Sequence, residues 1–283
     1  MVLNYGSKTL SESEGIVPFM KNDKFTRRTF IHSAFLKTAG IVAGALATNG
    51  CTSRTTTALA YRKPEKPKAV LWIGGHSHDF EAIAKIMTDF LPKQAPIEIE
   101  VVRDGSFVDS AGAEHLDVIL MNHCYNSAEG VLNEKQKQNL LKLVHDGTGI
   151  VAIHASYYSF TDWNEYHDKF FGARFIRHGK VDVILEVTIT DKEHPITKNL
   201  DDSFEAHSEL YQSSPIPKDC RILAYSKEKG QAESFPSVWV NNYGRGRIAT
   251  ILPAHWPDTY RLAAFQRLIT ASTLWAMRRP EKW

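Results

Sequence analysis

Residues 69–91 read AVLWIGGHSHDFEAIAKIMTDFL, and this stretch indicates the fold before any other part of the chain. The apolar run Ala69–Ile73 predicts a buried strand, and Phe80–Leu91 has the apolar spacing of an amphipathic helix. Two glycines at the junction allow a sharp turn between them. A strand that is followed at once by a helix is the repeating unit of a parallel α/β sheet.

The same alternation continues to the C-terminus. We therefore predict one α/β domain, with a mostly parallel sheet and helices on both of its faces. Further strands are predicted at Ile97–Val102, Asp117–Asn122, Gly149–His154, Val183–Thr190, Cys220–Tyr225, Ser237–Asn241 and Arg247–Leu252. Further helices are predicted at Asn133–His145, Thr161–Phe171 and Asp258–Met277. Asn133 and Asp258 favour a helix N-terminus because their side chains can cap it.

The composition is that of a globular protein, and it limits the partners. The chain has 283 residues, of which 43% are apolar, and a formal net charge of +2. Such a small positive charge argues against nucleic-acid binding, which needs many lysines and arginines to neutralise phosphates. Three cysteines cannot form a disulfide framework. We interpret Cys124 and Cys220 as free buried thiols, with one bridge between them as the alternative.

Residues 1–51 have the features of an export signal. Arg27 and Arg28 are followed by Thr-Phe, which matches the twin-arginine pattern. Residues 30–47 are too polar for a membrane span, which needs about twenty strongly apolar residues. We therefore predict a cleaved signal and a periplasmic protein, which contacts the membrane only through that signal or a lipid anchor. A cytoplasmic protein with a loose N-terminus is the alternative.

The sequence leaves the processing site open. Cys51 follows Thr-Asn-Gly and resembles a lipoprotein acylation site, although the usual leucine three residues upstream is absent. Cleavage after Ala47 or after Ala60 is the alternative. Residues 52–67 are rich in threonine, lysine and proline, a composition typical of a linker, so we predict a folded domain over residues 68–283.

Five of the twelve histidines follow predicted strands. They are His76, His78, His123, His154 and His255. Ligands of an open parallel sheet bind outside the carboxyl ends of its strands, so these imidazoles are expected at one rim of the sheet. His207 and Glu209 lie in a segment that reaches the same rim in this interpretation. Each histidine alone also has a simpler interpretation, as a hydrogen-bonding residue at the end of a loop.

Imidazole and carboxylate groups together suit proton transfer near neutral pH. We expect His154 or His255 to be the base, with Glu209 and His207 orienting it. The turn at residues 74–80 contains neither GxGxxG nor GxxxxGK[ST], so we expect no nucleotide cofactor.

Coordination of a divalent metal such as zinc is the second chemistry that these groups suit. His76, His78 and His123 are the candidate ligands, and otherwise they would bind substrate hydroxyls together with Asp79. The chain has no HExxH helix, so metal ligands would have to converge from separate loops.

Aromatic residues lie next to two of the histidines. Tyr157, Tyr158 and Trp163 follow His154, and Trp256 follows His255. Aromatic rings beside polar groups suit a sugar, whose C–H face stacks on a ring while its hydroxyls accept and donate hydrogen bonds. Packing within the hydrophobic core is the alternative for each ring.

Other catalytic patterns are missing. Ser156 lacks the GxSxG elbow of acyl-enzyme hydrolases. Cys124 has no flanking glycine turn of the kind that presents a nucleophile. Asp79 and Glu209 are the only carboxylates expected at the rim, so the facing pair that glycoside hydrolases use is not evident.

The chain resembles the ThuA-like (trehalose utilisation) proteins from about residue 68 to its end. The motifs that carry the resemblance are, in order, GGHSHDF, GIVAIHASYYSFTDWNEYHDKFFGARFIRHG, HPITKNL, HSELYQ and PSVWVNNYGRGRIATILPAHW. The resemblance implies a three-layer, flavodoxin-like α/β fold of the class I glutamine amidotransferase type, without the amidotransferase cysteine. It also places His178 on a family histidine. Ser208 and Ala254 differ from the family pattern, which has aspartate and glycine there, so a carboxylate of that pattern is lost.

The resemblance further implies a place in bacterial sugar catabolism, where partner dehydrogenases oxidise glycosides to 3-keto forms. We therefore expect an exported protein that acts on a 3-keto-disaccharide or glycoside by isomerisation, elimination or hydrolysis, with acid/base or metal assistance. Its partners would be a small carbohydrate and, in the same pathway, a sugar 3-dehydrogenase. A non-catalytic periplasmic sugar-binding protein is the alternative, and a metal-dependent hydrolase of ordinary glycosides is a third.

Overall fold

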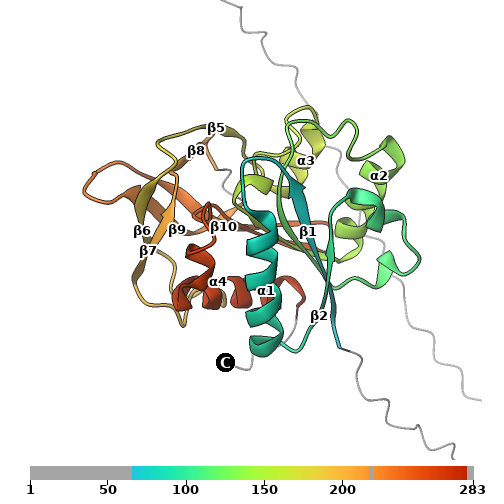
Figure 1. Ribbon diagram of the computed structural model, residues 1–283, viewed down its shortest axis with the longest axis horizontal. Coiled ribbons are helices and arrows are strands. Elements are labelled where there is room, and N and C mark those ends of the chain that lie inside the picture. The colour runs from blue at the N-terminus through green and yellow to red at the C-terminus, as the bar shows by residue number, and fades with distance from the viewer. Residues whose placement is uncertain (1–65, 217–218, 279–283) are drawn as a thin grey trace, which may run out of the picture. The chain divides into compact units, whose positions relative to one another are not determined.

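A computed structural model of the chain describes residues 66–216 and 219–278, which form a layered α/β structure (Figure 1). The strands are β1 (Lys68–Gly75), β2 (Glu98–Val102), β3 (Val118–Cys124), β4 (Gly149–Ile153), β5 (Phe175–His178), β6 (Val183–Ile189), β7 (Ser203–Ser208), β8 (Tyr211–Ser213), β9 (Arg221–Glu228), β10 (Ser234–Tyr243) and β11 (Gly246–Ile251). The helices are α1 (Phe80–Gln94), α2 (Glu134–Asp146), α3 (Asn164–Phe170) and α4 (Ala263–Ala276), with short 3-10 turns η1 (Gly105–Asp109), η2 (Ala113–His115), η3 (His154–Ser156) and η4 (Thr259–Arg261).

The main sheet has a parallel half and an antiparallel half. Its order is β2-β1-β3-β4-β11-β10-β9-β6-β7, and the first five strands of that order run parallel to one another. The other four are joined by antiparallel pairs, and β5 and β8 form a separate two-stranded sheet. β3 is buried along its whole length, as expected for a parallel strand covered on both faces. β6 alternates between buried and exposed residues, because helices do not cover both faces of the antiparallel half.

Two hydrophobic cores lie on opposite faces of the sheet. One contains Ile83 of α1 and Phe265 of α4 together with alternate residues of β1, such as Leu71. The other contains Leu140 of α2 and Tyr166 of α3, together with the residues of β1 that point the other way. Figure 1 shows α1 and α4 side by side in front of the sheet. The three-layer α/β fold expected from the sequence is therefore confirmed.

Three strands and the start of the last helix differ from the expected elements. β5, β7 and β8 were not predicted, because they are short and only partly buried, so they lack a clear apolar pattern. The last helix does not begin at Asp258 as predicted. Asp258 caps the 3-10 turn η4, and an extended Leu262 then separates that turn from α4.

The loops that follow β1, β3, β4 and β11 lie at one edge of the sheet, because these strands are parallel neighbours. The β5–β8 pair lies at the end of the molecule toward which the arrowhead of β1 points (Figure 1). The turn with the sequence GGHSHDF, which follows β1, is held close to the end of β3 by the backbone of Gly75 and His76. A Cβ on Gly75 would lie 1.9 Å from the carbonyl oxygen of Cys124, and His76 N donates to that same oxygen at 3.0 Å.

None of the helices in the described part of the chain is long and apolar enough to span a membrane. The twin-arginine pattern, Cys51 and residues 52–65 of the predicted linker (52–67) lie outside the described residues, so they stay predictions. Cys124 and Cys220 are both free, as expected, but only Cys124 is buried and Cys220 is partly exposed.

Candidate functional site

Three histidines and one glutamate meet at the carboxyl ends of the parallel strands. His78 belongs to the turn after β1, His154 follows β4, and His255 follows β11, while Glu209 lies between β7 and β8. One ligand atom from each residue lies within 4.8 Å of all the others. These four residues are called the His/Glu cluster below. They come from segments up to 177 residues apart, so only the sheet topology brings them together.

His154 occupies a strained turn directly after a central strand. β4 ends at Ile153, and His154 has a φ of 50°, which a non-glycine residue rarely adopts. Strain of this kind persists where the surrounding structure enforces it, and it is concentrated at functional sites. The turn therefore presents an imidazole after a central strand, the position at which α/β-hydrolases present a nucleophile on a strained elbow.

Backbone carbonyls fix the tautomers of two cluster histidines. Nδ1 of His154 lies 2.7 Å from the carbonyl oxygen of Leu252, and Nδ1 of His78 lies 3.2 Å from that of His76. A carbonyl oxygen only accepts hydrogen bonds, so Nδ1 is the protonated nitrogen in each ring. In the neutral rings, Nε2 therefore carries a lone pair. Carbonyls that hold the outer nitrogen of a histidine in this way are typical partners of metal ligands.

The inner atoms of the cluster are mostly hydrogen-bond acceptors. Oε1 of Glu209 lies 3.2 Å from Nε2 of His154 and 3.2 Å from Nδ1 of His255. Nε2 of His78 is buried and has no hydrogen-bond partner among the described residues. A buried acceptor without a donor is unfavourable unless something else occupies the space. A cation at the centre of the cluster would satisfy these lone pairs, so the donor set fits a divalent metal.

Electrostatics keep the cluster in its ligand form. Burial, together with the neighbouring His154 and His255, lowers the pKa of His78 to about 3. Burial also lowers the pKa of His154, although Glu209 acts in the opposite direction. Burial alone would raise the pKa of Glu209, but the ring nitrogens of His154 and His255 beside its carboxylate outweigh burial and hold that pKa below its usual value. Neutral imidazoles and an ionised carboxylate are the forms that bind metals.

Three of the four cluster residues, His78, Glu209 and His255, line a cavity of about 300 Å³. The cavity is lined by His76, Ser77, His78, Cys124, Tyr158, Phe175, His178, Val181, Glu209, Tyr211 and His255. Aromatic rings form its wall, since Phe175 lies 5.0 Å from Tyr158 and 4.9 Å from Tyr211 between ring centroids. No lysine or arginine is among these lining residues, so the cavity suits an uncharged ligand better than a phosphorylated one. Its size is that of a small-molecule site.

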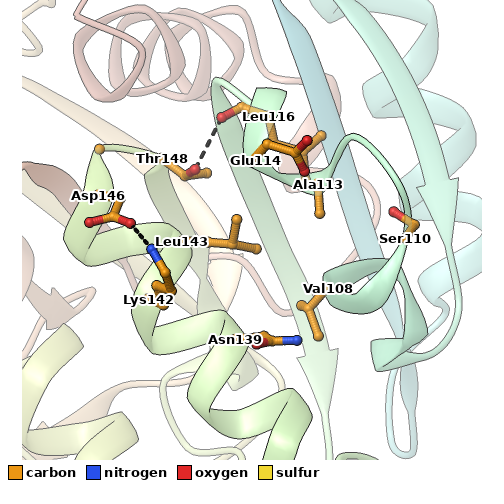
Figure 2. Close-up of a pocket in the computed structure, with 11 residues that line it drawn as sticks. Val108, Ser110, Ala113, Glu114, Leu116, Asn139, Lys142, Leu143, Asp146 and Thr148 are labelled. Carbon is orange, nitrogen blue, oxygen red and sulfur yellow. Dashed lines mark hydrogen bonds and ion pairs between the residues drawn. The ribbon is translucent and has the colours of Figure 1, made fainter.

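A second cavity of about 360 Å³ lies between α2 and the segment that contains η1 and η2 (Figure 2). Leu116 and Thr148, which line it, precede β3 and β4, so this cavity is at the opposite edge of the sheet. Figure 2 shows that Lys142 pairs with Asp146 on α2, and that the hydroxyl of Thr148 donates to the carbonyl of Leu116. Because these polar groups already have partners, the cavity offers no chemistry comparable to that of the His/Glu cluster.

The profile of the ThuA family, described as trehalose utilisation, matches residues 68–276. The chain belongs to the ThuA family. Among solved structures, the ThuA-like protein of Parabacteroides merdae is 18% identical, with a TM-score of 0.64 over 77% of this chain and 93% of that protein. The ThuA-like protein of Bacteroides uniformis is 20% identical, with a TM-score of 0.61 over 76% of this chain and 93% of that one. These likenesses show a shared fold. No curated protein sequence matches the chain.

All four cluster residues of this ThuA-family protein were expected at the site from the sequence, but in different roles. His154, His255 and Glu209 were expected as catalytic groups, and the structure brings them together with His78. His76 lies at the rim of the cavity, where its Nε2 is 3.0 Å from Oδ1 of Asn126.

His123 is not at the cavity, although it follows β3 as expected. Its ring is fully buried against Trp72, at 4.4 Å between centroids, and its Nδ1 is 3.0 Å from the hydroxyl of Ser159. Burial lowers its pKa to about 3. The side chain of His123 points to the α2 face of the sheet, because neighbouring residues of a strand point to opposite faces.

The other expected site residues divide between the cavity and its surroundings. Tyr158 and His178 line the cavity, and Nδ1 of His178 lies 3.1 Å from Oε2 of Glu209. Trp256 packs on the cluster histidine that precedes it, at 4.7 Å between ring centroids, and is partly exposed. Asp79 caps α1 by accepting from the backbone N–H of Ala82.

Two aromatic candidates lie in the core instead. Tyr157 is fully buried against Trp239, and Trp163 is stacked on Tyr166 of α3. Of His154, Tyr157 and Tyr158, which follow β4, only Tyr158 is among the residues that line the cavity.

His207 lies beside the cluster and not within it. Its two ring nitrogens are 2.8 Å from Asp258 and 2.6 Å from Asp182. Burial alone would lower the pKa of His207, but these two carboxylates outweigh it and raise that pKa. Phe175 and Tyr211, which line the cavity, were not named from the sequence as binding residues. Tyr211 follows Glu209 by two positions, and that spacing was the signal that could have found it.

Proposed function

We propose that this ThuA-family protein is an exported enzyme of carbohydrate catabolism that acts on a 3-keto-disaccharide or a 3-keto-glycoside. The observation that supports this proposal is the convergence of three imidazoles and one carboxylate at the end of an aromatic cavity. A 3-keto group acidifies the neighbouring C–H bond, so a positioned base can remove that proton. Enolisation then leads to isomerisation or to elimination of the glycosidic bond.

His78, His154, Glu209 and His255 would hold a divalent metal, and imidazole-rich sites suit zinc and other late first-row ions. A metal there supplies Lewis acidity, which polarises the keto oxygen of the substrate. A neutral imidazole has one lone pair, so a histidine that binds the metal cannot also be the base. If the cluster acts without a metal, His255 is the better of the two expected bases. Both nitrogens of His154 are already engaged, one by the Leu252 carbonyl and the other by the cluster.

The cavity wall supports a sugar as the ligand. Tyr158, Phe175 and Tyr211 provide ring faces for the C–H face of a pyranose, while His178 offers its Nε2 to the sugar hydroxyls. No charged group other than Glu209 and the histidines lines the cavity among the described residues, which supports a neutral sugar.

Two measurements on the full chain test the proposal. Elemental analysis of protein purified without chelators should find a divalent metal in stoichiometric amount. NMR spectroscopy of 3-keto-trehalose or a methyl 3-keto-glucoside incubated with the protein should show loss of the substrate. Replacement of both His154 and His255 by alanine should abolish turnover, whereas His115→Ala, at an exposed residue of η2, should not. Full turnover in the double variant would contradict the assigned roles.

A non-catalytic sugar-binding protein is the second candidate, and the aromatic wall of the cavity is the observation that favours it. Calorimetry with unoxidised trehalose and other glycosides separates the two candidates. Tight binding of an intact sugar without turnover of any keto-sugar would favour the binding protein.

Export and the pathway partner are part of the same proposal. The twin-arginine pattern at Arg27 and Arg28 supports transport to the periplasm. Cys51 supports attachment of the exported protein to the membrane through a lipid anchor. Cell fractionation should find the protein in the periplasm, and an Arg27→Lys, Arg28→Lys variant should remain in the cytoplasm. A sugar 3-dehydrogenase would supply the keto substrate. Cells without that dehydrogenase should therefore contain no 3-keto-sugar.

A further inference from the structure

The ring of His207 lies between two carboxylates that come from different segments. Nε2 is 2.6 Å from Oδ1 of Asp182, in the loop between β5 and β6, and Nδ1 is 2.8 Å from Oδ2 of Asp258, just before η4. An ionised carboxylate only accepts hydrogen bonds, so both ring nitrogens donate. Charge-assisted hydrogen bonds of this length are the stronger kind. His207 therefore joins the two segments through its side chain.

A second contact joins the same two segments. The indole of Trp256 stacks on the His207 ring, at 5.5 Å between centroids and 24° between planes, and its Nε1 donates to the carbonyl of Val181 at 3.1 Å. We call His207, Asp182 and Asp258 the clamp. The hydroxyl of Thr259 donates to the carbonyl of His207 at 2.8 Å, which fixes the clamp to β7. Side chain and backbone contacts together hold the β5–β6 loop against the segment after β11.

Both segments contribute residues that line the cavity. Val181 of the β5–β6 loop lines it, and so does His178, the last residue of β5. The segment after β11 carries His255 of the His/Glu cluster, whose backbone N–H donates to the hydroxyl of Ser208 at 3.1 Å. The position of the wall relative to the metal ligands therefore depends on contacts that pass through His207.

We propose that His207 is a positioning residue: it holds the β5–β6 loop in place over the cavity and thereby sets the fit of the substrate, without touching the substrate itself. His207 is absent from the residues that line the cavity, which agrees with an indirect role. The inference rests on the proposed function for its kinetic consequence, but the structural consequence is independent of it.

The contribution to substrate fit should exceed the contribution to global stability. The side chains of Asp182 and Asp258 are 78% and 62% exposed, and exposed ion pairs contribute little to unfolding free energy. Loss of the clamp should therefore lower the melting temperature by no more than about 5 °C. The local mobility of the loop should change far more, because few other contacts hold it.

The test compares three variants of the full chain. His207→Gln keeps the bulk but cannot donate in both directions, and Asp182→Ala removes one of the two carboxylates. Lys229→Gln is the matched control, since it breaks the exposed 2.6 Å ion pair with Glu205 elsewhere on the antiparallel half of the sheet. Hydrogen–deuterium exchange is followed for peptides that cover residues 176–184, and KM and kcat are measured with 3-keto-trehalose.

Both clamp variants should exchange at least about tenfold faster over residues 176–184, while Lys229→Gln should exchange as the wild type. KM should rise about tenfold with kcat reduced less than threefold, and the metal content should stay unchanged. Unchanged exchange in the clamp variants would overturn the proposal. So would a fall in kcat at constant KM, which would mean that His207 acts at the reacting atoms. If the wild type does not consume the keto-sugar, the proposed function fails, and the exchange experiment still decides the clamp.

Discussion

Nε2 of His154 and Oε1 of Glu209 lie 3.2 Å apart in surroundings that are almost closed to solvent, with side chains that are 1% and 4% exposed. The proton of His154 is on the other nitrogen, where the carbonyl of Leu252 accepts it. A lone pair and a carboxylate oxygen therefore face one another, an arrangement that needs a cation or an additional proton between them. The pair is the clearest sign that the cluster is built to bind a positive charge.

Glu209→Gln should remove most of the metal affinity. The substitution keeps the shape of the side chain but replaces the negative charge with an amide, whose N–H₂ group would face the protonated or metal-bound side of the cluster. We expect the metal affinity to fall at least about tenfold and turnover to fall by about 100-fold. Elemental analysis and NMR assays of the full chain measure both.

The matched control for this prediction is Glu205→Gln on β7. Glu205 is an exposed glutamate that forms an ion pair with Lys229. The Glu205→Gln variant should keep the metal content and the turnover of the wild type. A Glu209→Gln variant that binds metal as tightly as the wild type would show that the carboxylate is not a ligand.

Much of this site could be predicted because a parallel sheet places the ends of its strands at one edge. The pattern of strands was enough to expect His78, His154 and His255 near one another, and they meet in the His/Glu cluster. The direction of each side chain could not be predicted. His123 follows its strand in the same way, yet its ring faces the core on the α2 side.

The outer half of the site was harder to predict for a different reason. Phe175 and Tyr211 line the cavity from the short strands β5 and β8, and three or four residues are too few to show a period. Their antiparallel pairing depends on contacts between segments about 35 residues apart. Such pairing follows from tertiary packing, so local sequence patterns do not contain it.

The buried imidazole of His123 should make the protein sensitive to mild acid. Its pKa is about 3 in the folded state and about 6.5 in the unfolded state, so the unfolded chain binds the proton more readily between these values. The stability contributed by the neutral ring is complete above pH 6.5 and is lost progressively as the pH falls toward 3. Between pH 7 and pH 5 this amounts to about 2 kcal/mol.

His123→Phe should remove this dependence, because phenylalanine fits among the same aromatic rings and does not titrate. Urea unfolding at pH 7 and pH 5 measures the free energy of unfolding for both proteins. The wild type should lose about 2 kcal/mol more than the variant over this interval. Equal losses would mean that His123 is not responsible for the acid sensitivity.

Cys124 should resist alkylation in the folded protein, although it lines the cavity. Burial raises the pKa of its thiol to about 11, and the charge of Glu209 adds to this effect. At pH 8 only about one thiol in a thousand would be ionised, and the thiolate is the reactive form. Mass spectrometry of the Cys124 peptide after iodoacetamide treatment should show little modification at pH 8 and full modification in guanidinium chloride. Rapid alkylation of the native protein would contradict the buried environment.

Gly75→Ala should disrupt the turn that carries His76 and His78, and Gly112→Ala provides a matched control. The two glycines have nearly the same backbone angle, with φ of 93° and 95°, so alanine meets similar strain at both positions. A Cβ at residue 75 would also lie 1.9 Å from the carbonyl oxygen of Cys124, whereas residue 112 has nothing within 4 Å. The clash can be relieved only if the end of β1 moves away from β3.

We expect Gly112→Ala to lower the free energy of unfolding by about 1 kcal/mol, and Gly75→Ala to lower it by at least about 2 kcal/mol more. Urea unfolding measures this difference, and metal analysis should show that only the residue 75 variant loses metal. Equal losses of stability at the two positions would mean that the close approach between the β1 turn and β3 does not hold the cluster in place.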